Sequence, residues 1–196
     1  MLSPIALATW IAFCMPGADS AIAFAMVMAG SGGNPDLITD AQGQTRKLQD
    51  LKNANANADE LYVGLTQIPA RQLKARGIPA ELALHRCTNL AIGWHLWSEA
   101  HATAKEQQPT QWKAVSLAAS IYRENRAVLE TPYSKKVTDL AIAHVPVAPA
   151  PHGSRLYNEV AADWANGQRL LLRLEYPESQ LGRSQIMGHW IRATTE

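Results

Sequence analysis

The polar residues that could take part in chemistry are concentrated in short segments next to predicted helices. Residues 31–35 (Ser-Gly-Gly-Asn-Pro) follow an apolar stretch, residues 64–68 read Gly-Leu-Thr-Gln-Ile, and residues 87–90 (Cys-Thr-Asn-Leu) open a helix. A Ser-x-Tyr pair follows at residues 120–122, and Tyr133 comes directly after a proline. Each segment alone is a weak signal, so the information lies in their order along the chain.

The cysteines and histidines do not form a metal-binding pattern. A zinc site normally has three or four ligands, and Cys14 and Cys87 would need the others from distant parts of the chain. His95 and His101 are six residues apart on a predicted helix, which is a poor spacing for a metal pair. We therefore expect no metal and no cofactor. The two cysteines form either a single disulfide or two buried thiols.

In their order and spacing, these segments resemble the lysozyme-like lytic transglycosylases, most closely the subfamily that accompanies type IV secretion and conjugation machines. The resemblance covers residues 14–137. It implies an all-α, lysozyme-like domain with a long groove for peptidoglycan. Members of the family cleave the bond between N-acetylmuramic acid and N-acetylglucosamine without water. A glutamate at the end of the central helix protonates the leaving oxygen, then acts as the base while the 6-hydroxyl closes an anhydro ring.

The resemblance assigns substrate-binding positions to several residues of this chain. Ser31 matches the serine that follows the family glutamate and lines the cleft, Gln67 matches the glutamine whose amide lies near the reacting sugar, and Gly64 leaves room for backbone close to the substrate. Cys14 and Cys87 match two positions where this subfamily commonly has cysteine, which favours a disulfide. The positions implied for substrate binding are Ser31, Gly64, Gln67, Ser120, Tyr122 and Tyr133.

The chain departs from the family pattern at two positions. Gly30 stands where the family has its catalytic glutamate, and glycine has no proton to donate, so we expect little turnover. Arg123 replaces the asparagine that follows the family tyrosine, so that subsite is expected to read its sugar differently. Among nearby carboxylates, Glu60 is the best substitute acid; Glu124 and Asp36 are less favourably placed.

The helices that would position these residues are predicted from apolar periodicity and cap residues. Residues 18–29 are small and apolar on all sides after an N-cap at Asp19 or Ser20, as in a buried central helix. Residues 62–69 are expected to be irregular or briefly extended, and we predict no β-sheet. Further helices are predicted at residues 44–60, 69–76, 88–106, 110–129 and 132–143, with another helix start at residues 79–81.

Trp94 and Trp97 lie on the apolar stripe of the helix at residues 88–106, which favours a place in the core over a role as sugar platforms. Lys135 and Lys136 are interpreted as a solvated helix end, although contact with acidic peptide stems is the alternative.

Both ends of the chain are predicted to differ from the central domain, residues 14–143. Residues 1–20 start with an apolar run that is either a first buried helix or a signal peptide, and the run is too short to span a bilayer. The Pro-rich residues 144–152 predict a stiff linker. The tail, residues 153–196, contains one amphipathic helix at 154–175 that must dock on the domain, bind a partner or stay loose.

The composition is that of a folded chain: 47% of the residues are hydrophobic and 18% are charged. A formal net charge of +1 gives no reason to expect nucleic acid or an acidic membrane as a partner, and we expect no stable membrane span. The resemblance instead implies a periplasmic protein whose partners are peptidoglycan strands and components of the secretion or conjugation apparatus. A disulfide fits that oxidising compartment.

Three hypotheses for function follow. In the first, the protein binds peptidoglycan beside a secretion or conjugation apparatus and Gly30 impairs cleavage. In the second, it is a non-enzymatic scaffold that acts through its tail, residues 153–196. In the third, it is an active transglycosylase that uses Glu60.

Overall fold

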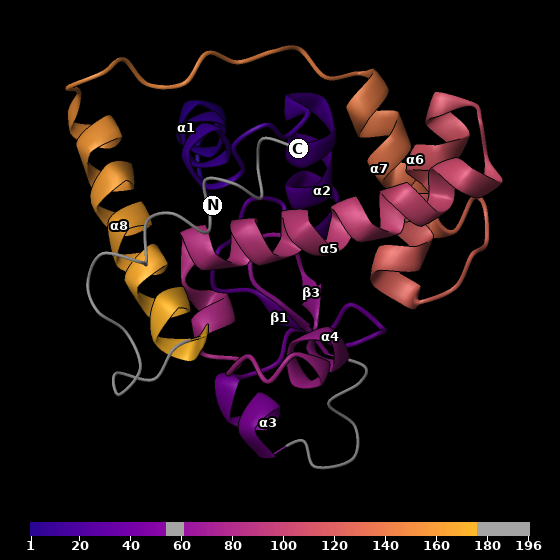
Figure 1. Ribbon diagram of the computed structural model, residues 1–196, viewed down its shortest axis with the longest axis horizontal. Coiled ribbons are helices and arrows are strands. Elements are labelled where there is room, and N and C mark those ends of the chain that lie inside the picture. The colour runs from indigo at the N-terminus through magenta and orange to yellow at the C-terminus, as the bar shows by residue number, and fades with distance from the viewer. Residues whose placement is uncertain (54–60, 176–196) are drawn as a thin grey trace.

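The computed structural model describes residues 1–53 and 61–175, and this part of the chain is mostly helical (Figure 1). The coarse expectation of a helical fold is therefore confirmed. The long helix α5 crosses the middle of the molecule, with α1 and α2 on one side and the short strands on the other. The helices are α1 (Pro4–Cys14), α2 (Ser20–Gly30), α3 (Leu48–Asn53), α4 (Ala70–Ala75), α5 (Arg86–Gln107), α6 (Gln111–Glu124), α7 (Pro132–Ile142) and α8 (Arg155–Glu175), with a 3-10 turn η2 (Leu82–Leu84).

Helix α2 is buried from several sides, as its sequence predicts. The Asp19 carboxylate caps its first turn by accepting hydrogen bonds from the backbone N–H groups of Ala21 and Ile22. Met26 faces the larger apolar cluster, shared with α5, α6 and α7, whereas Val27 faces a smaller cluster shared with α1. Because its side chains are small and apolar on all sides, α2 can be packed between these layers.

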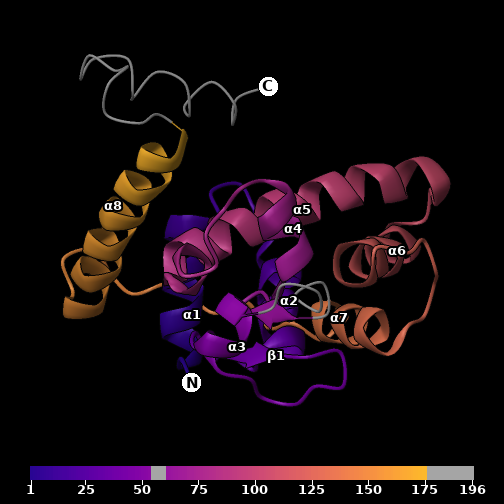
Figure 2. The ribbon, with the colours of Figure 1, turned by 90° about the horizontal axis from the view of Figure 1, so that it is seen from below.

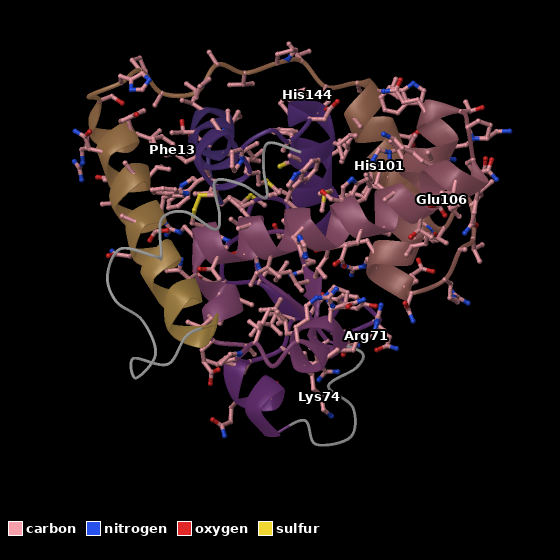
Figure 3. The ribbon with its side chains drawn as sticks, in the orientation of Figure 1. Phe13, Arg71, Lys74, His101, Glu106 and His144 are labelled. Carbon is pink, nitrogen blue, oxygen red and sulfur yellow. A yellow bond between two sulfur atoms is a disulfide. The ribbon has the colours of Figure 1, made fainter. Side chains whose placement is uncertain are left out.

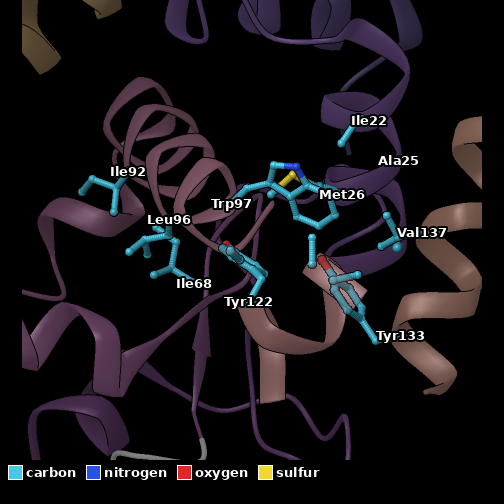
Figure 4. Close-up of a cluster of buried hydrophobic side chains, with 14 of the residues drawn as sticks. Ile22, Ala25, Met26, Ile68, Ile92, Leu96, Trp97, Tyr122, Tyr133 and Val137 are labelled. Carbon is cyan, nitrogen blue, oxygen red and sulfur yellow. The ribbon is translucent and has the colours of Figure 1, made fainter. Parts of the chain in front are cut away.

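Trp97 lies at the centre of the larger cluster and is fully buried (Figure 4). Its ring centroid is 6.2 Å from that of Tyr122 on α6, and Trp94 packs partly buried against the same core. The interpretation of both tryptophans as core residues is thus confirmed.

A small antiparallel sheet corrects the prediction that the chain forms no β-sheet. Strands β1 (Ile38–Thr39), β2 (Tyr62–Val63) and β3 (Ile68–Pro69) pair in that order. Val63 on the middle strand is in register with a residue of each neighbouring strand. Strands of two residues are too short to produce the alternation of polar and apolar residues that reveals a strand in a sequence.

Several helix boundaries also differ from the prediction. Helix α3 begins at Leu48 rather than at residue 44, because residues 44–46 instead turn back on Asp40 and bridge to β1. Helix α6 ends at Glu124 rather than at residue 129, because Asn125 adopts a left-handed conformation with φ +54°. The start predicted at residues 79–81 leads only to η2, and α5 begins after it. Residues 54–60 of the predicted 44–60 helix lie outside the described residues.

Residues 4–14 form a packed first helix, which is one of the two alternatives for this apolar run. Ser3 caps α1 by accepting a hydrogen bond from Ala6 N, and Pro4 occupies the first turn, where no backbone donor is needed. Leu7 and Trp10 are buried against α2 and α5.

A disulfide joins Cys14, the last residue of α1, to Cys87 in the first turn of α5 (Figure 3). The S–S distance is 2.04 Å and the Cα atoms are 5.2 Å apart. The disulfide is therefore the correct one of the two alternatives for the cysteines. It ties the first helix to the long helix that crosses the molecule.

The described part of the tail docks on the main domain. Ala150 N donates to Thr9 Oγ1 of α1, and Val160 of α8 is fully buried. His85, just before α5, pairs with Asp163 of α8 at 3.1 Å. Figure 2 shows α8 on the α1 side of the molecule, away from α6 and α7. Docking is thus the observed outcome for residues 150–163, and among the described residues no helix is long and apolar enough to cross a membrane.

Candidate functional site

The end of α2 has the tight turn predicted from residues 31–35. Ser31 follows the helix, and its hydroxyl donates to Val27 O and accepts from Gly33 N, both at 3.2 Å. Gly32 and Gly33 have φ values of +61° and +82°, in the region that favours glycine. Ser31 is buried and its hydroxyl is engaged within the turn, so its direct role is to fix the end of the helix.

Gly30, the last residue of α2, lies directly against Gln67. A Cβ atom at position 30 would be 3.0 Å from Gln67 Cγ and 3.2 Å from Gln67 Cβ. That approach is closer than ordinary van der Waals contact, so a larger residue at position 30 requires Gln67 to move by a few tenths of an ångström. The structure thus joins two positions, 30 and 67, that the sequence separates widely.

Gln67 is fully buried and its side chain is saturated with hydrogen bonds inside the protein. Its Oε1 accepts from Thr39 Oγ1 at 2.6 Å, and its Nε2 donates to Leu37 O and Gly64 O, each at 2.9 Å. Both amide protons are used, so in this conformation Gln67 positions the loop. Contact between its amide and a sugar would require one of these bonds to open.

Gly64 provides space for Asn89 of α5. A Cβ atom at Gly64 would be 2.2 Å from Asn89 Nδ2, and φ is +73°. The close approach that requires glycine here is therefore to Asn89, not to a ligand in the structure as described. The segment at residues 87–90 includes Asn89, but nothing in that segment indicates that the Asn89 side chain reaches the loop at residues 64–67.

Asn89 organises the loop between β2 and β3. Its Nδ2 donates to Val63 O at 2.9 Å and Ala83 O at 2.7 Å, and its Oδ1 accepts from both the backbone N–H and the hydroxyl of Thr66 at 2.8 Å. Every hydrogen-bonding group of the buried amide is satisfied. This contact, between residues far apart in the chain, determines where Thr66 and Gln67 lie.

Tyr122 of α6 binds the same loop. Its Oη donates to Thr66 O at 3.0 Å, and burial raises the pKa of its phenol far above the ordinary value. Tyr122 is thus a neutral hydrogen-bond donor that connects α6 to the loop touching Gly30. Ser120, by contrast, is hydrogen-bonded to Thr131 Oγ1 at 3.1 Å, where it helps to hold the start of α7.

Tyr133, at the start of α7, is also buried, but its hydroxyl has no hydrogen-bond partner within the part of the chain that the structure describes. Burial raises the pKa of this phenol to about 12, against a smaller opposing effect of the Arg123 charge. The Arg123 guanidinium carbon is 4.9 Å from the centroid of the Tyr133 ring and 3.8 Å from that of Tyr62. Arg123 Nη1 is buried and likewise has no partner.

Further positive charge lies around these residues. Lys136 Nζ donates to Ala29 O at 3.0 Å, in the last turn of α2, so this lysine is not simply a solvated helix end. Arg71 Nη2 donates to Arg123 O at 2.7 Å, from α4 to the end of α6. Sequence patterns singled out neither contact, because each joins helices that are distant in the chain.

The candidate substitute acids are not brought to Gly30 by any described contact. Glu124 forms an ion pair with Arg126 at 3.0 Å, and Asp36 is exposed beyond the turn. Glu60 lies outside the described residues. Within the described ranges, no group of three or more His, Cys, Asp or Glu side chains is arranged to hold a metal ion.

Taken together, the contacts converge on the end of α2. Gly30 at the end of α2 and Tyr122 on α6 both contact the loop at residues 64–67, and Tyr133 on α7 lies in the same apolar cluster as Tyr122. The donors of Gln67 and Tyr122 are engaged within the protein, so the unpaired donors in this region are Tyr133 Oη and Arg123 Nη1. Comparisons with protein-family models, curated proteins and solved structures found no match to this chain.

Proposed function

We propose that this protein is a periplasmic, lysozyme-like protein that binds peptidoglycan glycan strands beside a type IV secretion or conjugation apparatus, with cleavage impaired by Gly30. The observation that carries the proposal is the contact between Gly30 and Gln67, whose loop also receives the Tyr122 hydrogen bond. These are the positions at which the sequence resembles the transglycosylase family. If the resemblance is correct, these residues must lie close together at the end of the central helix, and their contacts support that expectation.

The chemistry of the residues around Gly30 explains why cleavage should be impaired. Glycosidic cleavage needs a group that protonates a poor leaving oxygen and then accepts a proton. A phenol such as Tyr133, with a pKa of about 12, stays protonated at neutral pH and is too weak an acid to supply that proton readily. The polar groups of Gln67, Tyr122 and Lys136 are hydrogen-bonded within the protein, and none of them can act as acid and then base in this setting.

The experiment is a digestion of purified peptidoglycan by the wild-type protein, Gly30→Glu and Gly30→Gln, with products examined by mass spectrometry for the anhydro end. Co-sedimentation with insoluble peptidoglycan measures binding in parallel. Gly30→Gln is the matched control, because it imposes the same displacement of Gln67 without supplying an acid. We expect all three proteins to bind and only Gly30→Glu to release anhydro products.

Two results would contradict the proposal. If the wild-type protein does not sediment with peptidoglycan, glycan binding is wrong. If Gly30→Glu is folded and binds glycan but remains inert, position 30 does not correspond to the family glutamate. Release of anhydro products by the wild-type protein would instead favour the third hypothesis, and Glu60→Gln would then be expected to abolish it.

A scaffold role for the tail is the second candidate, and an exposed aromatic residue favours it. Helix α8 docks through Val160, whereas Trp164 is 39% exposed on the same helix. An exposed tryptophan beside a docked face is a feature of surfaces that bind other proteins. Trp164→Ser should then reduce assembly of the apparatus while leaving glycan binding unchanged; unchanged assembly would argue against this role.

A further inference from the structure

The flat face of the Arg123 guanidinium is stacked on an aromatic ring, so only the N–H groups along its edge can form hydrogen bonds. It lies over the ring of Tyr62 at 3.8 Å from the ring centroid and near the ring of Tyr133 at 4.9 Å. Aromatic rings stack on the flat faces of a guanidinium, whereas its N–H groups point outward in its plane. The contact region of Tyr62, Arg123 and Tyr133 is called the niche below. Arg123 as a whole is only partly buried, so the niche is not sealed within the core.

Two donors of these residues have no acceptor among the described residues. Arg123 Nη1 and Tyr133 Oη are both buried, and neither has a hydrogen-bond partner in residues 1–53 and 61–175. Tyr133 itself is 9% exposed, and its phenol keeps its proton because burial raises its pKa to about 12. Buried donors of this kind are rare in folded proteins because leaving them unpaired is costly, and a charged donor is the most costly. Such donors are expected where a ligand supplies the acceptor.

Lys136, on the same helix as Tyr133, adds positive charge where it donates to Ala29 O at the end of α2. Glu124, the acidic neighbour of Arg123 in the chain, is bound to Arg126 instead. The potential at the niche therefore favours an anion, and the planar edge of a guanidinium matches a carboxylate.

We propose that Arg123 and Tyr133 form a subsite for a carboxylate carried by the glycan ligand, next to the Gly30 end of α2. This inference rests on the proposed function, and under it the acceptor is the lactyl carboxylate of N-acetylmuramic acid in strands whose peptide stems have been removed. The carboxylate accepts from the Arg123 edge and from the Tyr133 hydroxyl. The protein then distinguishes peptide-free peptidoglycan strands from neutral glycans such as chitin, which lack that group.

The test is a calorimetric titration of the full wild-type chain with two matched glycans. One is a soluble, peptide-free glycan of alternating N-acetylglucosamine and N-acetylmuramic acid. The other is the same preparation with its lactyl carboxylates converted to methyl amides. Because hydrogen bonds to a charged group are among the stronger ones in proteins, we expect the neutral glycan to bind at least about tenfold more weakly.

Variants then assign the preference to these residues. Arg123→Asn should bind both glycans with the affinity that the wild type has for the neutral one, and Tyr133→Phe should lower the preference partially. Arg155→Asn is the matched control, because Arg155 is exposed and lies on α8, away from α6 and α7 (Figure 2). It should keep the full preference. Circular dichroism verifies that each variant is folded. If Arg123→Asn does not fold, Arg123→Lys is the second variant, because it keeps the positive charge but loses the planar pair of N–H donors.

The outcomes separate this inference from the proposed function. Equal wild-type affinity for the two glycans would overturn the carboxylate subsite and leave glycan binding intact. Binding of neither glycan would overturn the proposed function and the subsite with it. If folded Arg123→Asn lost affinity for the charged and the neutral glycan equally, Arg123 would be a structural residue and the subsite would also be wrong.

Discussion

The contact between Asn89 and the loop at residues 64–67 can be tested by a double-mutant cycle. Asn89→Ala removes four side-chain hydrogen bonds, to Thr66 N, Thr66 Oγ1, Val63 O and Ala83 O. At about 1 kcal/mol for each bond, the free energy of unfolding should fall by about 4 kcal/mol. That is a large part of the 5–15 kcal/mol typical of a domain, so the variant should fold but be marginal.

The second variant of the cycle is Gly64→Ala. Its Cβ would be 2.2 Å from Asn89 Nδ2 and 2.8 Å from Ala83 O, at a backbone φ of +73°. The left-handed conformation alone costs about 1–2 kcal/mol for a residue with a side chain, and the contact with Asn89 adds to this cost. In the double variant the amide is gone, so only the backbone strain and the Ala83 contact remain.

We therefore expect the double variant to be more stable than the sum of the single effects predicts, by at least about 1 kcal/mol. The assay is urea unfolding followed by far-UV circular dichroism, with all four proteins compared at one pH. Asn158→Ala is the matched control, because Asn158 makes one long, exposed bond to Gly153 O and should change stability by less than about 0.5 kcal/mol. Additive effects within about 0.5 kcal/mol would refute the packing of Gly64 against Asn89.

Three further predictions concern stability. Replacing both Cys14 and Cys87 by serine should lower the free energy of unfolding by about 4 kcal/mol, because the disulfide closes a sequence separation of 73 residues; a loss below about 1 kcal/mol in urea unfolding would contradict this. Burial, with a contribution from the Lys105 charge, lowers the pKa of His101 below 6.5, so the unfolded chain binds more protons near that pH and stability should fall as the pH drops from about 7 to about 5. The free energy of unfolding, measured by urea unfolding, should vary less with pH in His101→Gln than in the wild type. An unchanged slope would show that His101 does not cause the pH dependence. Tyr133→Phe removes a buried hydroxyl without a partner, so it should keep or raise the free energy of unfolding by up to about 1 kcal/mol; a clear loss of stability would show that the hydroxyl is hydrogen-bonded.

The parts of the fold that could be predicted are those fixed by neighbours in the chain. Asp19 caps α2, Thr131 and Pro132 open α7, and the glycines after α2 turn the chain, each through contacts within a few residues. The predicted boundaries failed where a local pattern met a competing contact. Residues 44–46 are polar enough for a helix, but they turn back to bind the Asp40 carboxylate.

The sequence predicted which residues belong to the candidate site, but it did not predict how their side chains contact one another. The resemblance identified Gly30, Gln67 and Tyr122, and the structure brings these three together. Their contacts differ from those expected: the Gln67 amide is bound inside the protein, and Ser120 supports α7. Such contacts depend on side-chain geometry between elements, which no spacing in the sequence encodes.

The sequence by itself determined that the chain is mostly helical, that a small-residue helix is buried at its centre, and that position 30 has no acid to donate. These properties depend on residue identity and on periods of three to four residues. Only the tertiary structure decided that a three-stranded sheet forms, that Asn89 holds the loop beside Gly30, and that the Arg123 guanidinium lies against the Tyr133 ring. Hydrogen bonds and stacking between distant segments depend on the distance between those segments in space, and that distance is set by the packing of the whole core.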